Sequence, residues 1–162
     1  MGRMARNGLL VLAVLAVPTL GAAQERAGVD LSIGYAMLQS PEYSGFAADF
    51  GWQSARGVGV TVDVGGHFDE GDYLLLFAAG PRLSRQIKPG LTLSGRLLAG
   101  VVTFEGEGVG AFVAYPGLAV DFATDRRVGF RLQGDWPLLT AHGVYPQIPR
   151  FSASVVIRPR KR

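Results

Sequence analysis

The sequence predicts an all-β fold in which eight antiparallel strands close up-and-down into one barrel, preceded by a cleavable leader. Three observations carry this prediction. Apolar and small or polar residues alternate strictly, as in Val58–Val64; eight such segments recur, each bounded by turn residues; and no helical periodicity follows residue 24. Because successive side chains of a strand point to opposite faces, a period of two indicates strands.

The composition indicates a folded and unusually apolar chain. The 162 residues fit one domain, with 23 Gly, 48% hydrophobic residues and only 18% charged residues. The absence of cysteine excludes disulfides, a thiolate nucleophile and cysteine metal sites. We expect no cofactor.

The basic charge excess sits mostly at the chain ends. The pI is 9.6, but removing Arg3 and Arg6 from the 16 basic residues leaves 14 against 13 acidic ones. No basic stripe interleaved with aromatic residues remains. We therefore expect no nucleic-acid partner.

The first residues have the order of a secretory signal. A basic start is followed by the mostly apolar run Leu9–Leu20 and then by the small residues Gly21, Ala22 and Ala23. A membrane anchor is the alternative, but the run is shorter than the ~20 residues that a spanning helix needs, and Pro18 interrupts it. We predict a signal peptide over 1–23 and the barrel domain over 24–162.

The two faces of the expected strands differ in size and charge. One face carries bulky apolar residues such as Val60, Phe130 and Val155. The other face carries small residues, short carboxylates and arginines, and neither Lys nor Glu, which a water-exposed face would be expected to carry. We therefore predict a transmembrane barrel whose apolar face contacts lipid and whose polar face lines a narrow interior.

An ionised group in a narrow, poorly solvated interior is costly unless it is paired. The charged residues of the polar face therefore predict an internal ion-pair network, extended by one glutamine. Its predicted members are Asp30, Asp49, Asp63, Arg82, Arg96, Asp121, Arg131, Gln133, Asp135 and Arg158.

Two alternatives reverse the direction in which the faces point. The polar face could be an ordinary solvated sheet face. The whole chain could also be a soluble periplasmic barrel of the lipocalin kind, which binds a small apolar ligand between inward-facing valines. Both alternatives require Val60, Phe130 and Val155 inside and Asp63 and Arg131 in solvent.

The connections fall into two sets. With a periplasmic N-terminus, basic turns are expected at 54–57, 85–90 and 124–127 on the periplasmic side, and short acidic loops at 39–43, 68–72, 104–110 and 140–147 on the other. Pro81 and Pro116 each lack a ladder donor, which predicts a bulge or a strand end there. Leu74, Leu76 and Leu98 fall on the interior face, which predicts a partly apolar plug.

Three stretches carry a resemblance to a known group: "FAAGPRLS" (Phe77–Ser84), "GFRLQGDW" (Gly129–Trp136) and "PRFSASVVIR" (Pro149–Arg158). With the leader, they resemble the small eight-stranded outer-membrane barrels of the OmpA- and OmpX-like group. The resemblance implies an outer-membrane location and places Arg82, Gln133 and Asp135 inside the barrel. Barrels of this group usually end their closing strand on an aromatic residue, from which Val155–Arg162 differs.

Candidate catalytic and ligand sites are few. The cluster Gly106–Gly110 has no helix after it, so we expect a hairpin loop rather than a phosphate site. Asp69, Glu70 and Asp72 lack the EF-hand spacing, and we expect them to be solvated rather than metal-bound. His67 beside Asp69, or His142, could be cast as a hydrolase centre, but no converging nucleophile can be named.

We therefore expect a non-catalytic, monomeric outer-membrane protein with a structural or surface-interaction role. Its expected partners are outer-membrane lipid, lipopolysaccharide and the outer-membrane assembly machinery. An eight-stranded barrel is just wide enough for side chains to fill it, so no free diffusion pore is expected.

Overall fold

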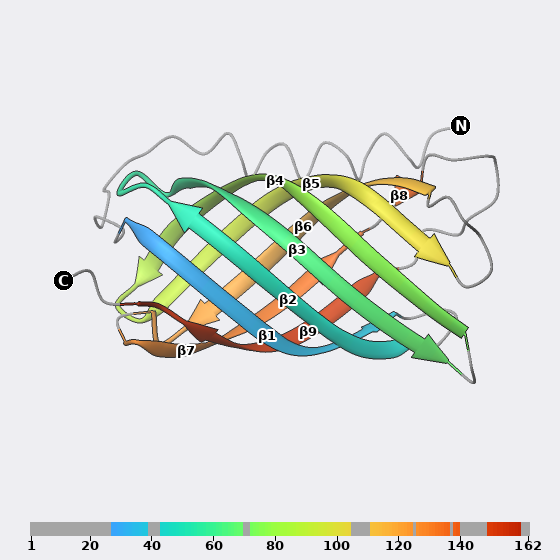
Figure 1. Ribbon diagram of the computed structural model, residues 1–162. Helices are drawn as coiled ribbons and strands as arrows, with labels where there is room; N and C mark the ends of the chain where they lie inside the picture. The colour runs from blue at the N-terminus through green and yellow to red at the C-terminus, as the bar shows by residue number, and fades with distance from the viewer. Residues whose placement is uncertain are drawn as a thin grey trace, which may run out of the picture.

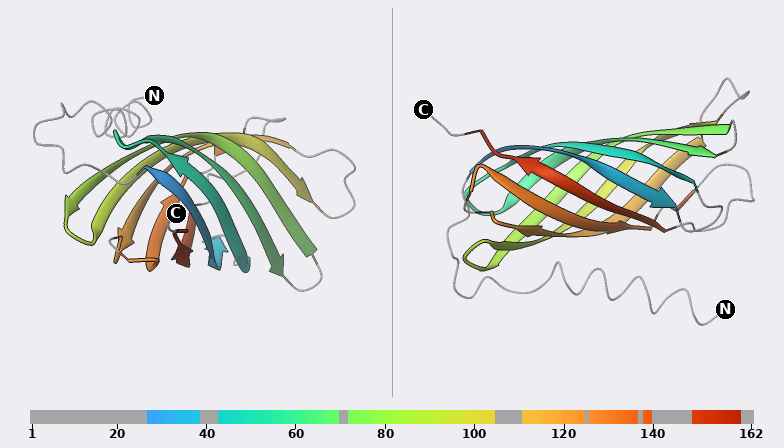
Figure 2. Two further views of the ribbon diagram at one scale, coloured as in Figure 1. Left: turned by 60° about the vertical axis from the view of Figure 1, so that its left-hand side comes forward. Right: turned by 90° about the horizontal axis from the view of Figure 1, so that it is seen from below.

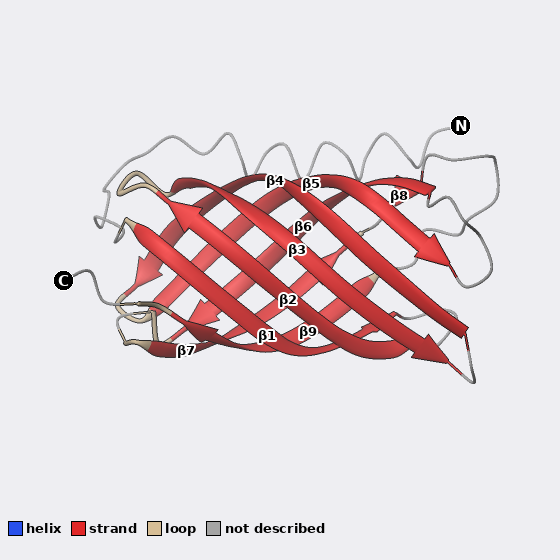
Figure 3. Ribbon diagram, in the orientation of Figure 1, coloured by secondary structure: helices blue, strands red, loops and turns tan. Residues whose placement is uncertain are grey.

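The strands of the barrel are consecutive neighbours along the chain. The computed structural model describes residues 27–38, 43–69, 72–104, 111–124, 126–136, 138–139 and 149–159. These residues form strands and turns and no helix (Figure 3). Among them, no helix is long and apolar enough to cross a membrane. The predicted signal peptide, residues 1–23, lies outside the described residues.

The strands tilt together around one closed ring (Figures 1 and 2). They are β1 (Gly28–Leu38), β2 (Ser44–Gln53), β3 (Val58–Asp69), β4 (Asp72–Lys88), β5 (Leu91–Phe104), β6 (Ala111–Phe122), β7 (Val128–Asp135), β8 (Leu138–Leu139) and β9 (Arg150–Ile157). All pairings are antiparallel, and the pairings of β1 with β9 and of β5 with β6 close the ring. The predicted antiparallel up-and-down topology is confirmed.

The nine segments make eight barrel strands. Asp135 of β7 pairs with Gly117 of β6, and Leu138 of β8 pairs with Ala114 of β6, in a single continuous register. β7 and β8 are thus two pieces of one strand. The interruption falls opposite Pro116, whose carbonyl accepts a 3.0 Å hydrogen bond from the Trp136 backbone N–H.

The prolines interrupt ladders without shifting them. β4 runs through Pro81 and pairs it with Val60 of β3, but its ladder with β5 omits Gly80 and Pro81 between the pairs Ala79–Ala99 and Arg82–Arg96. The bulge or strand end predicted at Pro81 is wrong, because β4 continues through it and the β4–β5 register is the same on both sides of the gap. The register shift lies instead between Gln86 and Lys88.

Both chain ends of the barrel lie at the end that carries the tight turns. β2 and β3 are joined by residues 54–57, and β6 and β7 by residues 123–127, close to the predicted limits. The turn predicted over 85–90 is shorter, because β4 continues to Lys88 and leaves Pro89 and Gly90. We call this rim, with the start of β1 and the end of β9, the turn end, and the opposite rim the loop end.

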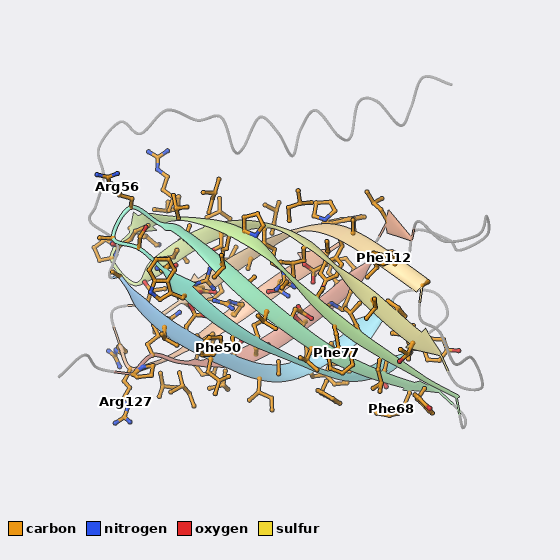
Figure 4. The ribbon with its side chains drawn as sticks, turned by 45° about the horizontal axis from the view of Figure 1, so that its top comes forward. Phe50, Arg56, Phe68, Phe77, Phe112 and Arg127 are labelled. Atoms are coloured by element: carbon orange, nitrogen blue, oxygen red, sulfur yellow. The ribbon has the colours of Figure 1, made fainter. Side chains whose placement is uncertain are left out.

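The bulky apolar side chains point outward. Val60, Phe130 and Val155 are 56%, 60% and 40% exposed, whereas Asp63 and Arg131 are 0% and 3% exposed. Figure 4 shows Phe50, Phe68, Phe77 and Phe112 projecting from the wall away from the interior. This arrangement excludes both alternatives with inward valines and confirms the outward direction of the apolar face.

Candidate functional site

The charged residues of the strands meet inside the barrel, which makes the lumen the candidate functional site. Five aspartates (Asp30, Asp49, Asp63, Asp121, Asp135) and four arginines (Arg82, Arg96, Arg131, Arg150) are at most 7% exposed, and the side chain of a fifth arginine, Arg158, is 20% exposed. All ten residues predicted from the sequence lie on the inward face. Arg150 is the member that the prediction missed.

The central cluster consists of Asp49, Asp63, Asp135, Arg96 and Arg150. Nε and Nη2 of Arg96 donate to the two carboxylate oxygens of Asp135 at 3.0 and 2.8 Å, and Nη2 also donates to Asp63 at 2.7 Å. Nη1 of Arg96 donates to Asp49. Such two-pronged contacts fix the guanidinium plane as well as its charge.

Arg150 closes the central cluster from the start of β9. Its Nη1 donates to Asp63 at 2.9 Å, and its Nε and Nη2 donate to Asp135 at 3.1 and 2.8 Å. Gln133 adds a hydrogen bond to Asp135 at 3.1 Å. Segments far apart in the sequence, β3, β5, β7 and β9, are thereby tied across the lumen.

The turn-side cluster consists of Asp30, Asp121, Arg82, Arg131 and Arg158. Nε and Nη2 of Arg131 donate to Asp121 at 2.7 and 2.9 Å, and Arg158 donates to the same carboxylate at 3.0 Å. Asp30 accepts from Arg82 at 3.1 Å and from Arg131 at 3.3 Å. An Arg131–Asp49 ion pair of 3.8 Å connects the two clusters.

The charges of the two clusters balance. Each of the five aspartates has two arginine partners within 4.0 Å, so the ten salt bridges leave no carboxylate of the clusters with a single partner. The four arginines of the sequence prediction left one positive charge too few. Arg150 supplies it, which is why its omission mattered.

A signal for Arg150 was present in the sequence. The inward residues of β9 are Arg150, Ser152, Ser154 and Val156. The prediction began this strand at Phe151, which is one residue too late to include the inward position of Arg150. Extending the two-residue period back by one step places Arg150 in the lumen.

An apolar layer covers the central cluster on its loop side. Leu76, Ala78, Leu98, Val102, Val113 and Tyr115 form one buried cluster, with Leu74 packed against it. The guanidiniums of Arg96 and Arg150 lie 5.8 and 5.4 Å from the centre of the Tyr115 ring, within the range of a cation–π contact. The predicted inward leucines are confirmed, and they form part of this layer.

Inward-facing glycines make room for the charged side chains. A Cβ at Gly51 would lie 2.7 Å from Nη1 of Arg82, and a Cβ at Gly117 would overlap Oδ1 of Asp135. Even one methyl group at these positions would therefore displace a cluster member. Side chains, rather than a channel, occupy this part of the lumen.

His67 is buried and has no hydrogen-bonded nucleophile among the described residues. Its side chain is 0% exposed, and neither ring nitrogen has a hydrogen-bond partner among the described residues. The hydrogen bond to a nucleophile that a hydrolase needs is not present at His67 within the described part of the chain. His142, Glu70 and Gly106–Gly110 lie outside the described residues, and so do the side chains of Asp69 and Asp72. Within the described part of the chain, no group of three or more His, Cys, Asp or Glu could hold a metal ion.

A closed ring of eight tilted strands with an apolar exterior and a charged, filled interior defines a transmembrane β-barrel of the outer-membrane class, as predicted. No family model and no curated protein matches the chain. Solved structures show the same fold at low identity. The crystal structure of OprG from Pseudomonas aeruginosa matches with a TM-score of 0.67 and 10% identity, over 87% of this chain and 100% of OprG.

Two further natural barrels are similar. Ail from Yersinia pestis, in a phospholipid bilayer nanodisc, matches with a TM-score of 0.55 and 16% identity, over 82% of this chain and 99% of Ail. Neisserial surface protein A matches with a TM-score of 0.55 and 13% identity, over 80% of this chain and 94% of that protein. These likenesses support the predicted small eight-stranded outer-membrane barrel as a fold.

Proposed function

We propose that this protein is a non-conducting, non-catalytic barrel of the outer membrane with a structural and surface-interaction role. The observation that carries the proposal is the filled lumen, in which the two clusters and the apolar layer succeed one another along the barrel. Each carboxylate has two cationic partners, so the clusters tie strands together across the interior. The interior therefore stabilises the barrel wall and does not conduct a solute.

We assign the surface-interaction role to the loop end of the barrel. The segments that join strands there carry Glu42, Glu70, Glu105 and Glu107 and no Lys or Arg, and Asp69 and Asp72 lie at the adjoining ends of β3 and β4. A macromolecule that binds this rim would therefore present a basic surface, because like charges repel across an interface. The remaining proposed partners are lipid and lipopolysaccharide acyl chains against the apolar exterior, and the assembly machinery during insertion.

Conductance measurements test the proposal. The full-length mature protein, reconstituted into a planar bilayer, is expected to give no conductance steps at any applied voltage at which the bilayer is stable. A known porin inserted in the same bilayer is the positive control, and faster migration on an unheated SDS gel verifies that the sample is folded. Regular steps from the folded protein would contradict a filled lumen.

The non-catalytic part of the proposal has a separate test. A hydrolase activity of the purified barrel that disappears in either His67→Gln or His142→Gln, with folding unchanged, would contradict it.

A further inference from the structure

The turn end carries a ring of exposed cations. Arg56 lies in the first turn, Lys88 at the end of β4, and Arg126 and Arg127 in the turn before β7, and all four are exposed. The residues of the three turns include one acid, Asp125. Figure 4 shows Arg56 and Arg127 extending from the same end of the barrel, at different places on its rim.

Backbone hydrogen bonds tie each turn to a neighbouring turn or strand end of the closed sheet. The Ser84 N–H donates to the Gly57 carbonyl at 2.8 Å, and the Thr124 N–H donates to the Gly90 carbonyl at 3.2 Å. The Arg158 N–H donates to the Arg127 carbonyl at 2.8 Å. The cations are therefore held around the circumference on connected backbone rather than on separate loops.

Each part of the ring adjoins the apolar exterior. Val58 follows Arg56 by two residues, Ile87 precedes Lys88, and Val128 follows Arg127, and these three apolar side chains are 53%, 56% and 49% exposed. Long basic side chains at the edge of an apolar surface extend their charged heads toward the polar interface. The ring is thus placed at headgroup depth wherever the apolar exterior is in hydrocarbon.

The opposite rim has the reverse charge. The loop-end segments and the adjoining ends of β3 and β4 contain six acids and no Lys or Arg, whereas the lumen clusters are balanced. The barrel therefore presents cations to one leaflet and anions beyond the other. Phosphodiester headgroups suit the turn end because a guanidinium binds phosphate oxygens with charge-assisted hydrogen bonds.

We propose that the ring of Arg56, Lys88, Arg126 and Arg127 binds the headgroups of anionic glycerophospholipids in the periplasmic leaflet. This rests on the proposed function, because the ring meets headgroups only in a membrane-spanning barrel. The ring selects an annulus of anionic lipid and fixes the depth of the turn end. The ring distinguishes headgroups by their net charge, so zwitterionic headgroups bind to it more weakly.

Trp52 is a built-in reporter for this binding. It is 48% exposed and lies one residue before the end of β2 at the turn end. Trp136→Phe leaves Trp52 as the single tryptophan, since the chain has two. Fluorescence of this variant in vesicles is quenched by lipids brominated on the acyl chains near the ester bonds, so brominated phosphatidylglycerol and brominated phosphatidylcholine can be compared at equal mole fraction.

Phosphatidylglycerol is expected to bind beside Trp52 about fivefold more tightly than phosphatidylcholine, because the attraction between one interfacial cation and anionic lipid corresponds to about this factor. The preference should fall in high salt, because exposed charges are screened. In Arg56→Gln/Lys88→Gln/Arg126→Gln/Arg127→Gln, the preference should disappear. The matched control, Glu42→Gln/Glu70→Gln/Glu105→Gln/Glu107→Gln, neutralises as many charges at the other rim and should keep it.

The outcomes separate the two proposals. Equal quenching by both lipids, or a preference that survives in the four-cation variant, overturns the lipid-binding ring and leaves the transmembrane barrel intact. Equal quenching together with ring-dependent sedimentation with purified peptidoglycan assigns the ring to that polymer and also overturns lipid binding. Absence of quenching by either lipid would instead contradict the membrane-spanning barrel itself.

Discussion

The arginines of the lumen form salt bridges with different numbers of carboxylates. Arg131 pairs with Asp30, Asp49 and Asp121, whereas Arg82 pairs with Asp30. A carboxylate in a poorly solvated interior is costly when its cation is removed. The cost of losing an arginine should therefore depend on how many carboxylates it leaves with one partner.

Arg131→Leu is expected to lower the free energy of unfolding by about 3–5 kcal/mol, the range for breaking a buried pair. Arg82→Leu should cost less, because Asp30 keeps Arg131. Urea unfolding in lipid vesicles, followed by tryptophan fluorescence, measures both. Asp30→Leu/Arg82→Leu is the control, since removing both charges should restore part of the loss. Unchanged unfolding midpoints in both single variants would contradict the paired clusters as a source of stability.

At the scale of the element, one strand shows how the wall separates two environments. In β3, Val58, Val60 and Val62 are exposed on the lipid side, while Thr61 and Asp63 are 2% and 0% exposed in the lumen. The alternation works because strand side chains point to opposite faces in turn. The same period predicted both faces from the sequence.

Val62→Lys and Val58→Lys test the depth of β3 in the membrane. A lysine at the middle of the hydrocarbon costs about 2–4 kcal/mol, and one near the interface about 0–1 kcal/mol. Val62→Lys should therefore fold poorly into vesicles, whereas Val58→Lys, beside the turn end, should fold nearly as the wild type does. The fraction of each variant that migrates in the compact form on unheated gels is the measurement. Equal folding of the two variants would argue against a lipid-facing β3.

The strand geometry at the two prolines was predicted less well from the sequence. The missing donor of Pro81 or Pro116 could be accommodated by a bulge, a strand end or a gap in one ladder. Which of these occurs depends on the partner strand, and the β4–β5 ladder simply omits Pro81 while the β3–β4 ladder keeps it. The sequence shows that a backbone hydrogen-bond donor is missing at each proline. Only the strand pairing shows which of the two neighbouring ladders is interrupted.

At the scale of the whole molecule, the strands form a closed ring. The β5–β6 and β1–β9 pairings join them into one closed sheet, so among the described strands only the two-residue β8 is paired on one side alone, and little unpaired backbone is offered to a second copy. We expect one protein copy per detergent micelle. Analytical ultracentrifugation under detergent-matching conditions should give a monomer mass at all protein concentrations. A mass that rises with concentration would count against the monomeric barrel.

The sequence alone determined the fold class, the number of barrel strands and the direction of both faces. These follow from the period of two and from the choice of Asp and Arg over Lys and Glu on the small face, which are local properties of each strand. The tertiary structure decided which charges meet. Arg150 begins β9, yet it contacts Asp63 of β3 and Asp135 of β7, because ring closure and the reach of a long side chain set these distances and the spacing along the chain does not.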